Sequence, residues 1–147
     1  METLLDDQLV DTLQIVWEET PQYSGPRVRD SPAELRVLRD FLTTQFWQSR
    51  VQFIADGVLN RHGRVQEYSG FLFPEDMDPD DEPFEGVMVF DPLDTIYLSD
   101  GAFARLMNRY FETIIEGVTS HRKDELKEAW WPEFLDIAQQ IKYRVSG

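Results

Sequence analysis

Residues 86–99 read Gly-Val-Met-Val-Phe-Asp-Pro-Leu-Asp-Thr-Ile-Tyr-Leu-Ser, which is two apolar runs around a short polar segment. The runs Gly86–Phe90 and Thr95–Leu98 have the β-branched and aromatic content that is typical of strands. Asp91-Pro92-Leu93-Asp94 fits a turn, because proline presets the backbone and aspartate accepts hydrogen bonds from nearby amides. The segment therefore predicts an antiparallel β-hairpin.

A third strand is expected just before this hairpin, at Gln66–Phe73, where Pro74 ends it. The acidic loop, defined here as Glu75–Glu85, connects that strand to the hairpin. Pro79 and Pro83 interrupt the loop, and its dense like charge favours a position on the surface. Together these segments predict a small antiparallel meander.

Helices are expected after the hairpin. Ser99 is suited to cap a helix over about residues 100–116, whose apolar face recurs at three- and four-residue spacing until Gly117 ends it. A last helical region is predicted over Lys123–Val145, with a kink at Pro132. Within it, the period places Trp130 on the core face and Trp131 away from it.

The amino-terminal half is also predicted to be mainly helical. Leucine and valine at helical spacing indicate an amphipathic helix over residues 4–18, followed by a loop at Thr20–Asp30. Ser31-Pro32-Ala33-Glu34 resembles a capping box and predicts a second helix that continues to about Leu59. A change of apolar face indicates a bend near Trp47–Ser49, or contacts on two sides. The expected class is α+β, as one domain over residues 1–147.

Composition excludes several kinds of protein. The chain has 147 residues, 19 of them aromatic, which is too many for a disordered chain. It has no cysteine, so disulfide frameworks, thiolate zinc sites and cysteine nucleophiles are excluded. No run approaches the length of a membrane span, so no membrane association is expected. The absence of cysteine fits a cytoplasmic protein.

Negative charge is concentrated in one part of the chain. The net charge is −14, from 28 acidic and 14 basic residues. The 40 residues from Val65 to Ala104 contain 11 acids and neither lysine nor arginine, whereas the other 107 residues are close to neutral. Such a segment is either a solvated loop or an electrostatic docking surface. It disfavours nucleic acid as a ligand and favours a basic partner.

Motifs for catalysis and for metal binding are not found in the sequence. His62 and His121 stand alone at predicted helix boundaries, and neither a nucleophile elbow nor a phosphate-binding glycine loop occurs. The acidic loop lacks the glycine and the terminal glutamate of an EF-hand, since Asp81 and Val87 occupy those positions. Its carboxylates crowd one loop instead of facing each other across a cleft, as glycosidase chemistry requires. We expect neither an enzyme nor a cofactor or metal site.

The central segment resembles a known family. Phe71-Leu72-Phe73-Pro74, the acids, Phe84-Glu85-Gly86-Val87-Met88-Val89-Phe90, Ile96-Tyr97-Leu98-Ser99 and an aromatic-rich helix are similar to immunity proteins of contact-dependent growth inhibition systems. The similarity is greatest to the group that neutralises ribonuclease toxins, and it covers about residues 68–116. It implies a small cytoplasmic protein that binds one toxin domain and blocks it, as a monomer or a 1:1 complex.

The same resemblance, with the charge pattern, suggests a binding site. A ribonuclease binds an anionic substrate in a basic cleft, which an anionic loop can cover. The partner-binding residues expected are Asp76, Asp78, Asp80, Asp81, Glu82, Glu85, Phe84 as an apolar anchor, and, in second rank, Asp91 and Asp94. The alternatives are an acidic chaperone or adaptor for a basic secreted cargo, and an acidic mimic of DNA.

Overall fold

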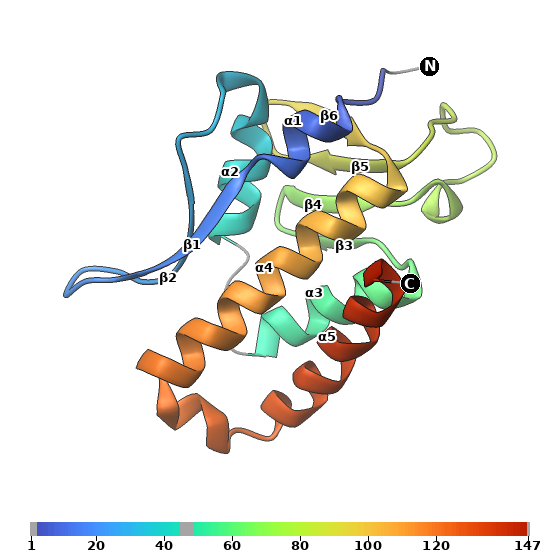
Figure 1. The fold of residues 1–147 in the computed structure, drawn as a ribbon. Helices are drawn as coiled ribbons and strands as arrows, with labels where there is room; N and C mark the ends of the chain where they lie inside the picture. The colour runs from blue at the N-terminus through green and yellow to red at the C-terminus, as the bar shows by residue number, and fades with distance from the viewer. Residues whose placement is uncertain (1–2, 45–48, 147) are drawn as a thin grey trace.

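The computed structural model describes residues 3–44 and 49–146, which form five α-helices and two antiparallel sheets (Figure 1). The helices are α1 (Asp7–Asp11), α2 (Arg36–Thr44), α3 (Ser49–Asn60), α4 (Asp100–His121) and α5 (Trp130–Ser146). The strands are β1 (Gln14–Glu19), β2 (Ser24–Arg29), β3 (Arg64–Gln66), β4 (Ser69–Leu72), β5 (Val87–Phe90) and β6 (Thr95–Leu98). The α+β class predicted from the sequence is confirmed.

The four-stranded sheet has the order β3-β4-β5-β6 and contains the predicted hairpin, since β5 and β6 pair around residues 91–94. The single strand expected at Gln66–Phe73 is instead two strands, β3 and β4. A tight turn at Glu67 and Tyr68 separates them, and Glu67 has the left-handed φ of 57° that such a turn requires. The acidic loop connects β4 to β5, as predicted.

One face of this sheet, the inner face, contributes to the hydrophobic core. Phe71 on β4 meets Phe41 of α2 and Phe103 of α4 at ring-centroid distances of 5.9 and 5.1 Å. Val87 and Val89 of β5 are fully buried on the same side. Because strand side chains alternate, the neighbouring residues of β4, β5 and β6 point to the opposite, outer face.

Helix α4 begins as predicted and ends later than predicted. The Ser99 hydroxyl accepts a hydrogen bond from the Ala102 amide at 3.1 Å, which is an N-cap. Gly117 does not end the helix, which continues to His121. Although α4 has 22 residues, neither it nor another helix in the described ranges is long and apolar enough to cross a membrane.

The prediction of a helix over residues 4–18 is wrong. Helix α1 contains only five residues, and β1 follows and pairs with β2, which occupies most of the loop expected at Thr20–Asp30. Ile15, Val16 and Trp17 belong to types that favour extended backbone, and they pair in antiparallel register with Val28, Arg27 and Pro26 of β2. The resulting hairpin extends to the left in Figure 1.

The second predicted helix also differs from the prediction at its start. Its first turn is a 3₁₀ turn, Ala33–Leu35, whose N-cap is Pro32, so the capping role expected for Ser31 is not found. Helix α2 then ends at Thr44 and α3 begins at Ser49. The bend expected at Trp47–Ser49 falls mainly on residues that lie outside the described ranges.

The carboxyl-terminal region differs from the prediction in where it breaks. A 3₁₀ helix, Lys123–Lys127, precedes α5, and Pro132 lies in the first turn of α5, where its missing amide proton breaks no helical hydrogen bond. The expected kink is therefore absent at Pro132. The tryptophans are reversed relative to the prediction, since Trp131 is 5% exposed and Trp130 is only partly buried.

Candidate functional site

A hydrogen-bonded turn connects the acidic loop to β4. Pro74 opens a 3₁₀ turn, Pro74–Asp76, and the Asp76 carboxylate accepts hydrogen bonds from the amides of Phe73 at 2.7 Å and Gly63 at 3.0 Å. Asp76, a predicted partner-binding residue, thus ties the start of the loop to the end of α3 and to β4. Its exposed position leaves it at the border of the candidate site.

Phe84 fixes the other end of the loop. Its side chain is 7% exposed and packs on Tyr97 of β6, with ring centroids 5.5 Å apart. The sequence suggested an apolar anchor presented to a partner, but the ring is buried against this chain's own sheet. Gly86 follows with φ of +76°, and a Cβ there would overlap the Leu98 carbonyl oxygen, so glycine is required where the loop enters β5.

Arg61, just after α3, neutralises the acids that border the loop. Its guanidinium donates to both carboxylate oxygens of Glu75, at 2.6 and 2.9 Å, and to Asp100 at 3.2 Å. The hydrogen bonds from Arg61 to Glu75 lower the pKa of the Glu75 carboxyl to about 2, which keeps it ionised in its ion pair. Arg61 also lies 4.6 Å from the centre of the Phe73 ring.

The remaining acids of the loop are exposed and form no ion pair with any described residue. The loop folds back locally, because the Asp78 amide donates to the Asp81 carboxylate at 2.8 Å and the Asp81 amide donates to the Asp78 carbonyl at 3.0 Å. Five of these exposed carboxylates, called here the five free carboxylates because they form no ion pair with a described residue, are those of Asp78, Asp80, Asp81, Glu82 and Glu85. They form the candidate binding site.

Asp91 and Asp94 lie at the opposite end of the four-stranded sheet, in the β5–β6 turn. Asp91 is only 11% exposed in its side chain and binds Arg36 at 2.6 Å. The hydrogen bond from Arg36 lowers the pKa of Asp91 despite its burial. Asp91 is therefore already paired with a cation of its own chain. Asp94 is exposed, but the length of a strand separates it from the acidic loop. The structure does not bring either residue together with the five free carboxylates.

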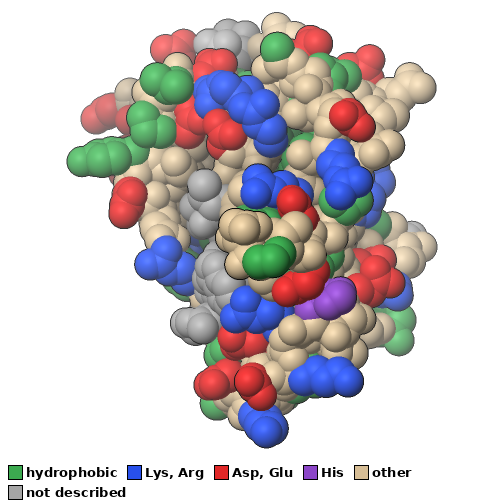
Figure 2. All heavy atoms as spheres, turned by 90° about the vertical axis from the view of Figure 1, so that its left-hand side faces the viewer, with side chains coloured by type: hydrophobic (Ala, Val, Ile, Leu, Met, Phe, Trp, Pro, Cys, Tyr) green, Lys and Arg blue, Asp and Glu red, His purple; other side chains and the backbone are tan. Residues whose placement is uncertain are grey.

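The loop and the β1–β2 hairpin lie on opposite sides of the molecule (Figure 1). The face seen from the hairpin side carries lysine and arginine mixed with aspartate and glutamate (Figure 2). There, Arg27 pairs with Glu18 across the two strands. Seven of the 11 acids of the Val65–Ala104 segment lie in the acidic loop, whereas Glu67, Asp91 and Asp94 lie in turns at the opposite end of the four-stranded sheet.

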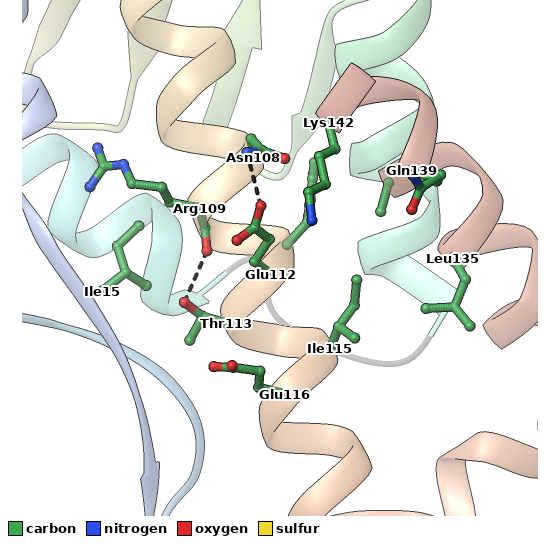
Figure 3. Close-up of a pocket in the computed structure, with 12 residues that line it drawn as sticks. Ile15, Asn108, Arg109, Glu112, Thr113, Ile115, Glu116, Leu135, Gln139 and Lys142 are labelled. Atoms are coloured by element: carbon green, nitrogen blue, oxygen red, sulfur yellow. Dashed lines mark hydrogen bonds between the residues drawn. The ribbon is translucent and has the colours of Figure 1, made fainter. Parts of the chain in front are cut away.

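A second feature is a groove of about 650 Å³ between α4 and α5, beside β1 (Figure 3). Ile115 and Leu135 line its apolar part. Glu112 and Glu116 line the α4 side, and Lys142 points from α5 into the groove. Charges of both signs are present here, so this groove lacks the electrostatic bias of the acidic loop.

Sequence reasoning did not find the outer face of the sheet. The nearly continuous apolar run of β5 does not indicate which of its residues face the core, and in the structure Met88 and Phe90 are only partly buried and lie outside it. Val87 and Val89, which are fully buried, alternate with Met88 and Phe90. Because all four residues are apolar, the sequence shows no apolar–polar alternation that would distinguish the two faces. Only the arrangement of the helices distinguishes the two faces.

The chain matches no protein-family model, no curated protein and no solved structure. Its function is therefore inferred from its own residues and surfaces.

Proposed function

We propose that this protein is an immunity protein that binds and neutralises a cognate toxin domain, most simply a ribonuclease, in the cytoplasm. The observation that carries the proposal is the acidic loop, with five exposed carboxylates that have no cationic partner among the described residues. The resemblance of residues 68–116 to immunity proteins supports the same function.

The mechanism is occlusion without chemistry. A nuclease domain must attract phosphates, so its active surface is basic, and a loop of fixed carboxylates can occupy that surface in place of RNA. The complementary fields also accelerate encounter between the two proteins. Because Arg61 pairs with Glu75 at the start of the loop and Arg36 pairs with Asp91 at the far end of the sheet, most of the unpaired negative charge of this segment lies at residues 78–85.

The experiment is a growth assay with the domain encoded at the carboxyl-terminal end of the reading frame directly upstream. That domain is expressed in a bacterial host with and without this chain. We expect growth arrest and RNA degradation without the chain, and growth with intact RNA in its presence, together with a 1:1 complex. Unrelieved arrest, or relief without a complex, would overturn the proposal.

The α4–α5 groove favours one alternative, a chaperone for a basic secreted cargo, because such a chaperone exposes an apolar groove to its client. The two functions differ in the same assay. A chaperone would raise the amount of soluble or exported cargo and leave its activity intact, whereas an immunity protein would suppress the activity at unchanged abundance.

A further inference from the structure

The outer face of the four-stranded sheet carries two cross-strand rows of uncharged residues. One row runs Val65–Gly70–Phe90–Thr95 across all four strands. The second row, Leu72–Met88–Tyr97, lies nearer the acidic loop. No residue in either row is charged, which is unusual for a sheet face that faces water.

These residues are separate from the hydrophobic core. Phe41 and Phe103 pack on the inner face, while Leu72, Met88, Phe90 and Tyr97 are partly exposed and belong to no part of the core cluster. Exposure increases toward the turn end of the sheet, where Val65 is 49% and Tyr68 77% exposed. At the loop end, Phe84 covers Tyr97.

Acidic residues border this apolar face at both ends. The five free carboxylates of the acidic loop lie beyond the Leu72–Met88–Tyr97 row, and Glu67 and Asp94 are exposed in the turns at the other end. The whole segment from Val65 to Ala104 contains no lysine or arginine. An apolar centre with a charged border is the usual anatomy of a protein interface.

We propose that the outer face of the four-stranded sheet, together with the acidic loop, is one continuous docking surface for a protein partner with an apolar patch bordered by lysine and arginine. The inference rests on the proposed function and identifies the part of this chain that contacts the toxin domain. The apolar rows contribute the area removed from water, and the acidic border contributes orientation and selectivity.

Charge complementarity selects this occupant over a second copy of the chain. Two copies each carry a net charge of −14. Any face-to-face pairing of this surface places the acidic borders of both copies in the same interface, where like charges repel. A basic partner instead meets complementary charge at both acidic ends of the face.

The test uses ¹⁵N-labelled full-length chain and two synthetic peptides of equal length and charge. One alternates leucine and lysine and the other alternates serine and lysine. We expect the leucine peptide to bind at least about tenfold more tightly, because only it has an apolar face. Its amide shift changes should centre on β5, β6 and residues 77–85.

Variants assign the binding to this face. Thr95→Arg and Val65→Arg each place a cation at one end of the Val65–Gly70–Phe90–Thr95 row. Each variant should bind the leucine peptide with an affinity lower by about fivefold or more. Leu126→Arg is the matched control, since Leu126 is an exposed apolar residue in the 3₁₀ helix Lys123–Lys127, which lies far from the four-stranded sheet in Figure 1. It should leave the affinity unchanged. Amide spectra of all three variants report whether each retains the fold.

Several outcomes would overturn the docking surface. These are equal affinity for the two peptides, shift changes centred on the α4–α5 groove, or full binding by both folded arginine variants. A dimer of the free chain that Thr95→Arg abolishes would assign the face to a second copy instead. Peptide binding as expected without relief of growth arrest would keep the surface and reject the toxin function.

Discussion

Trp17 of β1 lies directly over Gly117 of α4, and a Cβ added at Gly117 would overlap the indole ring. The indole nitrogen donates to Glu19 at 2.9 Å, so the ring is held on both sides. This contact packs the β1–β2 hairpin on α4, and it explains why a residue without a side chain occupies position 117 of the helix.

Gly117→Ala should therefore destabilise the protein. Alanine improves helix propensity by about 0.5–1 kcal/mol, but displacing the indole costs about 1–3 kcal/mol, so a net loss of about 1–2 kcal/mol is expected. Urea unfolding measures the change. Gly101→Ala in the first turn of α4 is the control, because its Cβ would meet only the flexible end of Arg105 at 3.0 Å. Equal stability of the two variants would contradict the packing.

Phe84→Ala should release the acidic loop from the sheet. The ring is nearly buried on Tyr97, and removing it should cost about 2 kcal/mol, less than in a closed core because the loop can partly collapse. Hydrogen exchange of amides 78–85 should accelerate. Leu93→Ala, an exposed apolar residue in the β5–β6 turn, should change neither quantity.

Asp91→Asn should reduce stability at neutral pH and have little effect in acid. Arg36 lowers the pKa of Asp91 in the folded chain, so the unfolded chain binds the proton more readily. The stabilisation is complete above the unfolded pKa, about 4, and is lost as the pH falls through the lower folded pKa. Urea midpoints of the wild type and the variant should converge on going from about pH 7 to about pH 2. Asp94→Asn removes the same charge from the same turn without breaking an ion pair, and a convergence of equal size in that variant would reject the assignment to Arg36.

Neutralising the loop should slow association with the toxin domain while leaving the fold intact. The variant Asp78→Asn, Asp80→Asn, Asp81→Asn, Glu82→Gln removes four charges and no ion pair, and the asparagine oxygen at residue 81 still accepts from the Asp78 amide. Association measured by stopped flow should slow by about tenfold at low salt, and the difference should shrink as salt rises. The melting temperature should change little.

Four exposed acids elsewhere provide the control for that variant. Neutralising Glu34, Glu116, Asp124 and Glu128 changes the net charge equally, at sites that form no ion pair within the described chain. Their effect on the association rate should be much smaller. If the two sets slow association equally, net charge is responsible and the loop is not the docking site.

Local features of the sequence predicted the fold well where a few neighbouring residues determine the backbone. The β5–β6 hairpin follows from Asp91-Pro92-Leu93-Asp94, and the start of α4 follows from Ser99, since both depend on hydrogen bonds within four residues. The β1–β2 hairpin was missed because leucine spacing from Leu5 to Leu13 is helical, and the strand signal of Ile15–Trp17 is brief. Its partner strand contains Gly25 and Pro26, which normally indicate a loop.

The candidate site was predictable in position but not in detail. Charge density alone located the acidic loop. It could not separate Asp91 from Asp80, because the cation that occupies Asp91 comes from Arg36, 55 residues earlier. It could not show that Phe84 is buried, since the surface that buries it is formed by Tyr97 of a later strand. Such pairings depend on tertiary contacts that no local pattern contains.

The anchored ends of the acidic loop also affect the thermodynamics of binding. Asp76 holds one end, Phe84 holds the other, and the Asp78–Asp81 hydrogen bonds and two prolines restrict the backbone between them. A loop that is already ordered loses little conformational entropy when a partner immobilises it. Most of the free energy of its contacts is then available as affinity, and the complex should dissociate slowly even though the loop is mainly polar.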